Sequence, residues 1–242
     1  MENNQFNLSG NSTFSQTNSN VKTFMANVFS WMFLALIITS VAAWWFANDL
    51  SLLRLLITEE GKMSMLGWVV MLAPIGFVLL MSFAFNKLSY TTLIILFITY
   101  AALVGISLSF VLLAYTLSSV FLTFAITAGM FGTMAVVGYT TKTDLTSFGK
   151  ILMMALVGVI IATVVNMFMH SSALNYIISY VGVAVFTGLT AYDVQKLKLI
   201  GQGTTYGDEN TKKLSIMGAL TLYLDFINLF LMLLRLFGDR RN

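Results

Sequence analysis

The sequence contains no cysteine, one proline and one histidine among its 242 residues. Without cysteine, a disulfide framework, a thiolate metal site and a cysteine nucleophile are all excluded. His170 has no second histidine or cysteine to join it, so the usual ligand set of a catalytic zinc site is missing. No nucleophile–base set is visible either. We therefore expect a protein that is not an enzyme and that carries no cofactor.

Charge is also scarce. Only 10% of the residues are charged, against about 25% in a soluble domain. Hydrophobic residues make up 58% of the chain, and its mean hydropathy is +0.85. So much apolar surface predicts an all-α integral membrane protein in contact with the lipid bilayer. The net charge of +3 is spread over the loops, unlike the clustered basic face of a nucleic-acid-binding protein.

Seven apolar stretches are long enough to span a bilayer, which requires about 20 residues. They lie at residues 25–47, 64–85, 91–114, 118–139, 151–169, 174–193 and 216–237. Residues 1–22 are mostly polar and are predicted to be a disordered tail, so that 23–242 form a seven-helix transmembrane domain. The two long connections are predicted at 48–63 and 194–215.

The lysines of the short loops predict the orientation, because cytoplasmic loops are enriched in cations. A cytoplasmic N-terminus places most of the lysines inside, but seven spans then place Arg240 and Arg241 outside. The alternative is one re-entrant segment with both chain ends inside. We favour seven spans.

Two aspartates fall within or at the edge of predicted spans, Asp193 in "GLTAYDVQKLK" and Asp225 in "LTLYLDFINLF". A charge at mid-bilayer costs at least about 2.5 kcal/mol on insertion scales, so such a residue is usually paired, hydrated or neutralised. Thr221 and Asn228 share a helix face with Asp225, and Asn228 is placed to donate a hydrogen bond to it. Lys196 follows Asp193 by three residues and is placed to offset its charge.

If the two carboxylates meet in a poorly hydrated site, they cannot both ionise cheaply and should share one proton. The protonated pair would hold its helices together. The ionised pair would repel itself and could take up a hard cation such as Ca²⁺ transiently. The spacing alone does not bring them together, because Asp193 is predicted at a helix end and Asp225 deep inside the next helix.

Small residues recur on one face of the fourth span, at Ala125, Gly129 and Gly132. Such a stripe lets helix backbones approach closely in lipid. Close packing is therefore the first interpretation, and the wall of a narrow water path is the second.

The two aspartate motifs, together with "AGMFGTMAVVGYTTKTDLTSFG", resemble the Bax inhibitor-1 (TMBIM) family, most closely its bacterial inner-membrane branch, over about residues 20–242. The resemblance implies six helices around a central C-terminal helix. It also implies a pH-sensitive Ca²⁺ leak gated by protonation of Asp193 and Asp225, in the bacterial inner (plasma) membrane with a cytoplasmic N-terminus.

Members of this family can carry an arginine near the cytoplasmic end of the second helix as a latch for the aspartate on the sixth. Here that end reads "MSFAFNKLSY", so Lys87 is the nearest cation. Lysine supplies a point charge but not the bidentate fork of arginine.

Two other functions stay open at this point. A proton-sharing carboxylate pair also suits a cation/proton exchanger, although no internal inverted repeat is evident. The protein could instead be a membrane interaction partner that modulates a quality-control protease or other membrane proteins.

Overall fold

A computed structural model describes residues 3–58, 62–205 and 207–241, with side chains from Ser19 onward. This part of the chain forms eight helices. They are α1 (Asn3–Asn48), α2 (Leu50–Leu56), α3 (Met65–Phe83), α4 (Tyr90–Ala114), α5 (Leu117–Thr140), α6 (Thr146–Met169), α7 (Ser172–Gln202) and α8 (Glu209–Phe237). The two short pairings, Ile57 with Met63 and Tyr115 with Arg240, are isolated bridges between loop segments. The predicted all-α class is confirmed.

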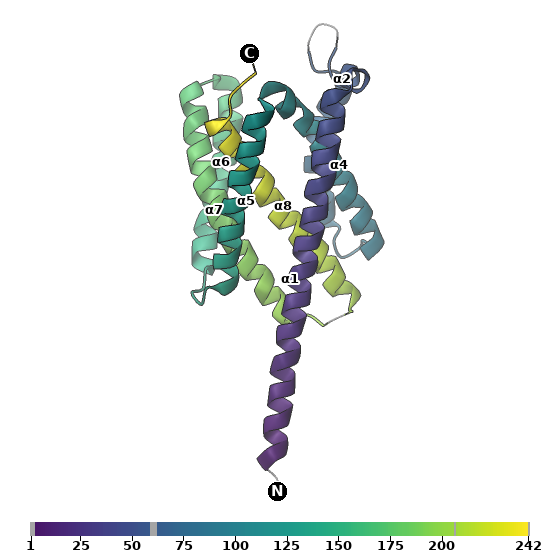
Figure 1. Ribbon diagram of the computed structural model, residues 1–242, viewed down its shortest axis with the longest axis vertical. Coiled ribbons are helices and arrows are strands. Elements are labelled where there is room, and N and C mark those ends of the chain that lie inside the picture. Colours follow the sequence, from purple (N-terminus) through teal and green to yellow (C-terminus); the bar gives the residue numbers. More distant parts are fainter. Residues whose placement is uncertain (1–2, 59–61, 206, 242) are drawn as a thin grey trace.

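Seven of the helices are long and apolar enough to cross a membrane, and α2 is too short to do so. The chain ends lie at opposite ends of the bundle (Figure 1). The seven-span prediction is therefore confirmed, and Arg240 lies at the end away from the N-terminus. The α2 helix occupies the predicted 48–63 connection, where Asp49 caps it by accepting a hydrogen bond from the Ser51 amide at 2.8 Å.

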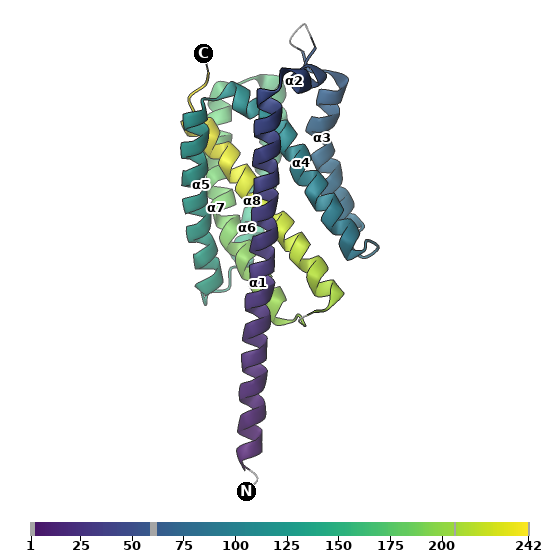
Figure 2. The ribbon, with the colours of Figure 1, turned by 45° about the vertical axis from the view of Figure 1, so that its right-hand side comes forward.

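The last helix, α8, is the centre of the bundle. It packs against α1, α4, α5 and α7 and runs obliquely between them in both views (Figures 1 and 2). Leu222 and Leu229 lie on one side of this helix and Tyr223 on another, and all three are fully buried. Because most of its surface is covered by other helices, α8 contributes to both clusters of buried hydrophobic residues.

The two helices that carry the aspartates are longer than predicted. We expected the sixth span to end at residue 193 and the seventh to begin at 216, but α7 continues to Gln202 and α8 begins at Glu209. The polar residues of the predicted 194–215 loop extend these helices beyond their apolar parts. Within that extension, Lys198 donates a hydrogen bond to the carbonyl of Tyr139 on α5 at 2.8 Å.

The first helix begins at Asn3, inside the stretch for which the sequence predicts disorder. It projects well beyond the rest of the bundle (Figure 1). Its packed part starts near Val21 and Phe24, which join the main hydrophobic cluster. The division at residue 22 between tail and transmembrane domain stays a prediction.

The small residues of the fourth span do not pack as expected. Ala125, Gly129 and Gly132 are exposed on the outer face of α5, and a Cβ added at either glycine would meet nothing within 4 Å. The buried face of α5 instead carries residues such as Thr127 and Gly138. Polar threonines can face the interior because their hydroxyls bond within the helix, as Thr127 does to Thr123 at 2.7 Å. The packing prediction was therefore wrong for this stripe.

Candidate functional site: an aspartate pair between α7 and α8

Asp193 and Asp225 meet in the interior of the bundle. Their side chains interact directly; Asp225 is only 5% exposed, and Asp193 is half-buried. Asp225 Oδ2 is fully buried, with no hydrogen-bond donor among the described residues. A carboxylate oxygen in such a place is costly unless a proton or a cation satisfies it.

The oblique path of α8 explains why the two carboxyl groups meet. Asp193 lies nine residues before the end of α7, and Asp225 lies sixteen residues after the start of α8. At 1.5 Å per residue these lengths correspond to about 14 Å and about 24 Å along the two helix axes. Because α8 crosses the bundle at a slant (Figure 2), part of the longer distance along α8 runs across the bundle and not along its long axis. The two carboxyl groups can therefore lie at the same depth. The sequence could not show this tilt.

The polar neighbours of Asp225 on its own helix are satisfied elsewhere. Asn228 donates to the carbonyl of Leu224 at 2.8 Å, and Thr221 donates to the carbonyl of Met217 at 3.1 Å. The hydrogen bond that we expected from Asn228 to Asp225 is therefore not formed, because the amide bonds back to its own helix. This leaves Asp193 as the polar partner of Asp225.

The structure does not bring Lys87 to Asp193. Lys87 is exposed in the turn after α3, and α3 packs mainly on α2 and α4, away from α7. Lys196 is the cation that acts electrostatically on Asp193, and its Nζ lies 6.0 Å from the centre of the Tyr192 ring. The supporting role of Lys196 and the latch role of Lys87 both stay predictions, and of these two lysines only Lys196 acts on Asp193 in this conformation.

Gln195 fixes the helix that carries Asp193. Its Nε2 donates to the carbonyl of Thr143 and its Oε1 accepts from the amide of Leu145, both at 2.8 Å. The side-chain amide therefore bridges α7 to the 141–145 connection between α5 and α6. Sequence reasoning missed this residue, because a glutamine in a polar helix extension carries no distinctive spacing.

Aromatic rings pack between α5 and α8 on the C-terminal side of Asp225. Phe226 packs edge-on against Phe124 at 5.3 Å and against Phe131 at 5.5 Å between ring centroids. One turn further along α8, Phe230 also contacts Phe124 at 6.2 Å. This aromatic layer, defined here as Phe124, Phe131, Phe226 and Phe230, joins α5 to α8 between the aspartate pair and the end of the bundle that carries the C-terminus.

The aspartate pair is not a built metal centre. No group of three or more histidine, cysteine, aspartate or glutamate side chains is arranged to hold a metal within the described ranges. A Ca²⁺ ion normally takes six to eight oxygen ligands. Two carboxyl groups can therefore recruit a cation for a short time but do not form a cage around it.

The family model described as inhibitor of apoptosis-promoting Bax1 matches residues 21–242. The chain belongs to the Bax inhibitor-1 family. Inner membrane protein YbhL of Escherichia coli K12 is 47% identical over 227 residues, which cover 93% of this chain and 95% of YbhL.

Similar relatives occur in other bacteria. An uncharacterized protein of Borreliella burgdorferi is 44% identical over 219 residues, covering 90% of this chain and 93% of that protein. The uncharacterized protein RP147 of Rickettsia prowazekii is 42% identical over 234 residues, covering 97% and 95% of the two chains. The resemblance to the bacterial branch of the Bax inhibitor-1 family is confirmed, and the chain is a multi-pass inner-membrane protein.

Proposed function

We propose that this Bax inhibitor-1 family protein is a Ca²⁺ leak pathway whose opening is controlled by protonation of Asp193 and Asp225. The observation that carries the proposal is the contact between two carboxyl groups in the interior, one of which leaves a buried oxygen without a donor. A shared proton supplies that donor and allows α7 and α8 to stay in contact.

The mechanism follows from the charge of the pair. With one shared proton, the two carboxyl groups attract each other and hold α7 against α8. When the proton leaves, two like charges face each other in a poorly hydrated site, and their repulsion favours a conformation with α7 and α8 further apart. The ionised oxygens attract a divalent cation, so we expect Ca²⁺ flux to rise as pH is raised.

The aromatic layer supports a closed pathway in the described conformation. Phe131 and Phe226 are buried, and their rings contact each other between α5 and α8. A hydrated Ca²⁺ ion cannot pass a close-packed aromatic contact, because its water shell would be lost without replacement oxygens. Separation of α7 and α8 would have to be accompanied by movement of these rings.

The test is Ca²⁺ flux against pH in proteoliposomes that contain a Ca²⁺-sensitive dye. Asp225→Asn should flatten the flux–pH curve, because an amide at this position can hydrogen-bond to Asp193 at every pH without losing a proton. Asp193→Asn should act in the same way. Asp208→Asn is the matched control, since asparagine also caps helix N-termini and Asp208 caps α8 away from the pair.

An unchanged flux–pH curve in both variants of the pair would refute the gating role. A pH-sensitive dye in the same vesicles separates a leak from an exchanger, because coupled transport moves protons in a fixed ratio to Ca²⁺. If no preparation carries Ca²⁺ above empty vesicles, the role as an interaction partner of other membrane proteins becomes the better explanation.

A further inference from the structure

A large polar cavity lies at the end of the bundle opposite the N-terminus, away from the aspartate pair. Its volume is about 930 Å³, and it is bounded by the last turns of α6 and α8, the start of α7 and the C-terminal segment. It also extends inward, because Thr163 and Ser179 line it about two turns from the nearest ends of α6 and α7. The cavity thus begins at the bundle end and reaches into the membrane-spanning part.

The charges in this cavity are all positive. Arg235 and Arg240 line it together with His170, and none of its described lining residues is acidic. Neither arginine forms an ion pair with any side chain in the described part of the protein. The neighbouring carboxylate, Asp239, is not among the described lining residues, and its Oδ2 accepts a hydrogen bond from Ser119 on α5 at 3.4 Å.

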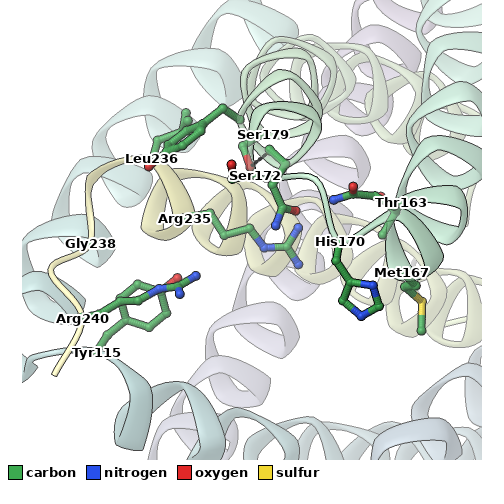
Figure 3. A pocket seen from close by; sticks show the side chains of 13 residues that line it. Tyr115, Thr163, Met167, His170, Ser172, Ser179, Arg235, Leu236, Gly238 and Arg240 are labelled. Carbon is green, nitrogen blue, oxygen red and sulfur yellow. Dashed lines mark hydrogen bonds between the residues drawn. The ribbon is translucent and has the colours of Figure 1, made fainter. Parts of the chain in front are cut away.

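The two guanidinium groups reach the cavity from different segments. Figure 3 shows Arg235 extending from α8 toward Ser172 and His170, whereas Arg240 lies beside Tyr115. Asn175 and Tyr176 add an amide and a phenol from the first turn and a half of α7. The cavity therefore offers N–H and O–H donors from several directions around a space free of carboxylates.

The walls of the cavity are held in place by local hydrogen bonds. His170 ends α6 in the left-handed conformation with φ 51°, and the Asn166 side chain accepts from the amide of Ser171 at 3.0 Å. On the opposite wall, the amide of Thr116 donates to the carbonyl of Asp239 at 3.0 Å, and the amide of Arg241 donates to that of Ala114 at 2.9 Å. Arg240 lies between these two anchoring bonds, so its backbone position is fixed.

We propose that this cavity is a binding site for a phosphate group. Arginine recognises phosphate through two parallel N–H···O bonds, and hydroxyl and amide groups add further donors. A divalent cation is disfavoured here, because hard cations require oxygen ligands and are repelled by two guanidinium groups. The site is thus distinct in chemistry and in place from the proposed Ca²⁺ pathway, and its existence does not depend on that pathway.

The phosphate group can come from two sources. The cavity is lined by residues at the ends of the candidate spans α6, α7 and α8. Because lipid headgroups lie at the ends of membrane-spanning helices, we infer that an anionic phospholipid can place its headgroup there. The volume of about 930 Å³ also admits a soluble phosphate compound, as ligand pockets usually measure about 300–1,000 Å³. The experiment must separate these two sources.

The test uses the full chain in two arms. In the first, inorganic phosphate is titrated onto the detergent-purified protein by calorimetry. In the second, the protein is placed in nanodiscs of phosphatidylcholine with or without phosphatidylglycerol, and the retained lipid is counted by native mass spectrometry. Arg235→Gln and Arg240→Gln should each weaken binding about tenfold or more, the effect of losing one charge-assisted hydrogen bond.

Arg54→Gln is the matched control, because Arg54 is an exposed arginine on α2 at the same end of the bundle but outside the cavity. It should bind like the unmodified protein. Arg235→Lys retains the positive charge but lacks the planar guanidinium group, so its binding affinity should lie between those of the unmodified protein and Arg235→Gln. This variant replaces Arg235→Gln if glutamine prevents folding.

Saturable phosphate binding that is lost in the cavity variants identifies a soluble ligand as a source. Retention of phosphatidylglycerol that is lost in the same variants, without phosphate binding, identifies a lipid headgroup. If neither arm distinguishes the cavity variants from Arg54→Gln, the proposal is overturned.

Discussion

Gly138 of α5 lies directly against the backbone of Ala191 on α7. A Cβ added at Gly138 would overlap the Ala191 carbonyl oxygen and approach the Ala191 Cα to 2.9 Å. Ala191 precedes Asp193 by two residues, so this contact sets how closely α7 approaches α5 beside the aspartate pair. Only glycine permits the approach, because every other side chain begins with the atom that does not fit.

The first prediction concerns this contact. Gly138→Ala should lower the free energy of unfolding by about 1–3 kcal/mol, the usual cost of overpacking, and should shift the flux–pH curve because it displaces α7. Gly129→Ala is the control, since nothing lies within 4 Å of its added Cβ. That change should leave the melting temperature of the detergent-solubilised protein unchanged or raise it. Equal melting temperatures for the two variants would contradict the packing argument.

The second prediction concerns the bridge made by Gln195. Gln195→Ala removes two hydrogen bonds to the 141–145 connection, which together should contribute about 1–3 kcal/mol. The amide of Leu145 loses its acceptor and should exchange with deuterium faster. Gln202→Ala, at the exposed end of α7, should leave the exchange of Leu145 unaltered. An unaltered Leu145 rate in Gln195→Ala would show that the bridge does not hold this connection.

The third prediction concerns the aromatic layer. Phe226→Leu removes the ring that contacts both Phe124 and Phe131, so Ca²⁺ flux should rise at the acidic end of the pH range, where the pair is protonated. Phe121→Leu is the matched control, because Phe121 is 77% exposed on the outer face of α5. If both variants show the flux of the unmodified protein, these rings do not block the pathway.

The fourth prediction concerns Asp144, in the connection before α6. Hydrogen bonds from the Thr146 side chain and backbone lower the pKa of Asp144 from its usual value of 3.8, the amide bond measuring 2.8 Å. A depressed pKa in the folded state means that this carboxylate stabilises the fold above its unfolded-state pKa. That contribution is lost as pH falls through the folded-state pKa.

The side-chain part of this effect can be removed separately. Thr146→Val keeps the backbone amide but deletes the hydroxyl, so the pKa of Asp144 should rise toward its usual value in a carboxyl NMR titration. Thr140→Val is the control, because the Thr140 hydroxyl bonds to Val136 within its own helix at 2.7 Å. A pKa that stays fully depressed in Thr146→Val would show that the hydroxyl contributes nothing and would leave the Thr146 amide and the charge of Lys150 as the causes.

Much of the fold could be predicted from composition and span length alone. Apolar stretches of about 20 residues are long enough to span a bilayer, so seven spans were favoured from the sequence. The arginines after the last span left open an alternative with both chain ends on one side. The positions of the helix ends were harder to predict from the sequence. The continuation of α7 past Asp193 to Gln202 was missed because polar helix turns outside the bilayer do not show in a hydropathy pattern.

The candidate site was likewise only partly predictable from the sequence. The cost of a buried charge singled out Asp193 and Asp225 from the sequence, whereas their contact depends on the slant of α8, which packing alone determines. The exposed Gly129 and the packed Gly138 illustrate the point further, because both are glycines of one helix and only their neighbours distinguish them. The polar cavity was missed because Arg235 and Arg240 are brought together by the end of α8 and the segment after it.

The central position of α8 has a consequence for how the protein is made. The helix that fills the middle of the bundle leaves the ribosome after the seven helices before it, so those helices enter the bilayer while the element they surround is still missing. During that interval the inner faces of α1, α4, α5 and α7 can contact only each other, lipid or the insertion machinery. A chain that stops before residue 209 would therefore lack its core, and this bundle can assemble only after α8 has been synthesised.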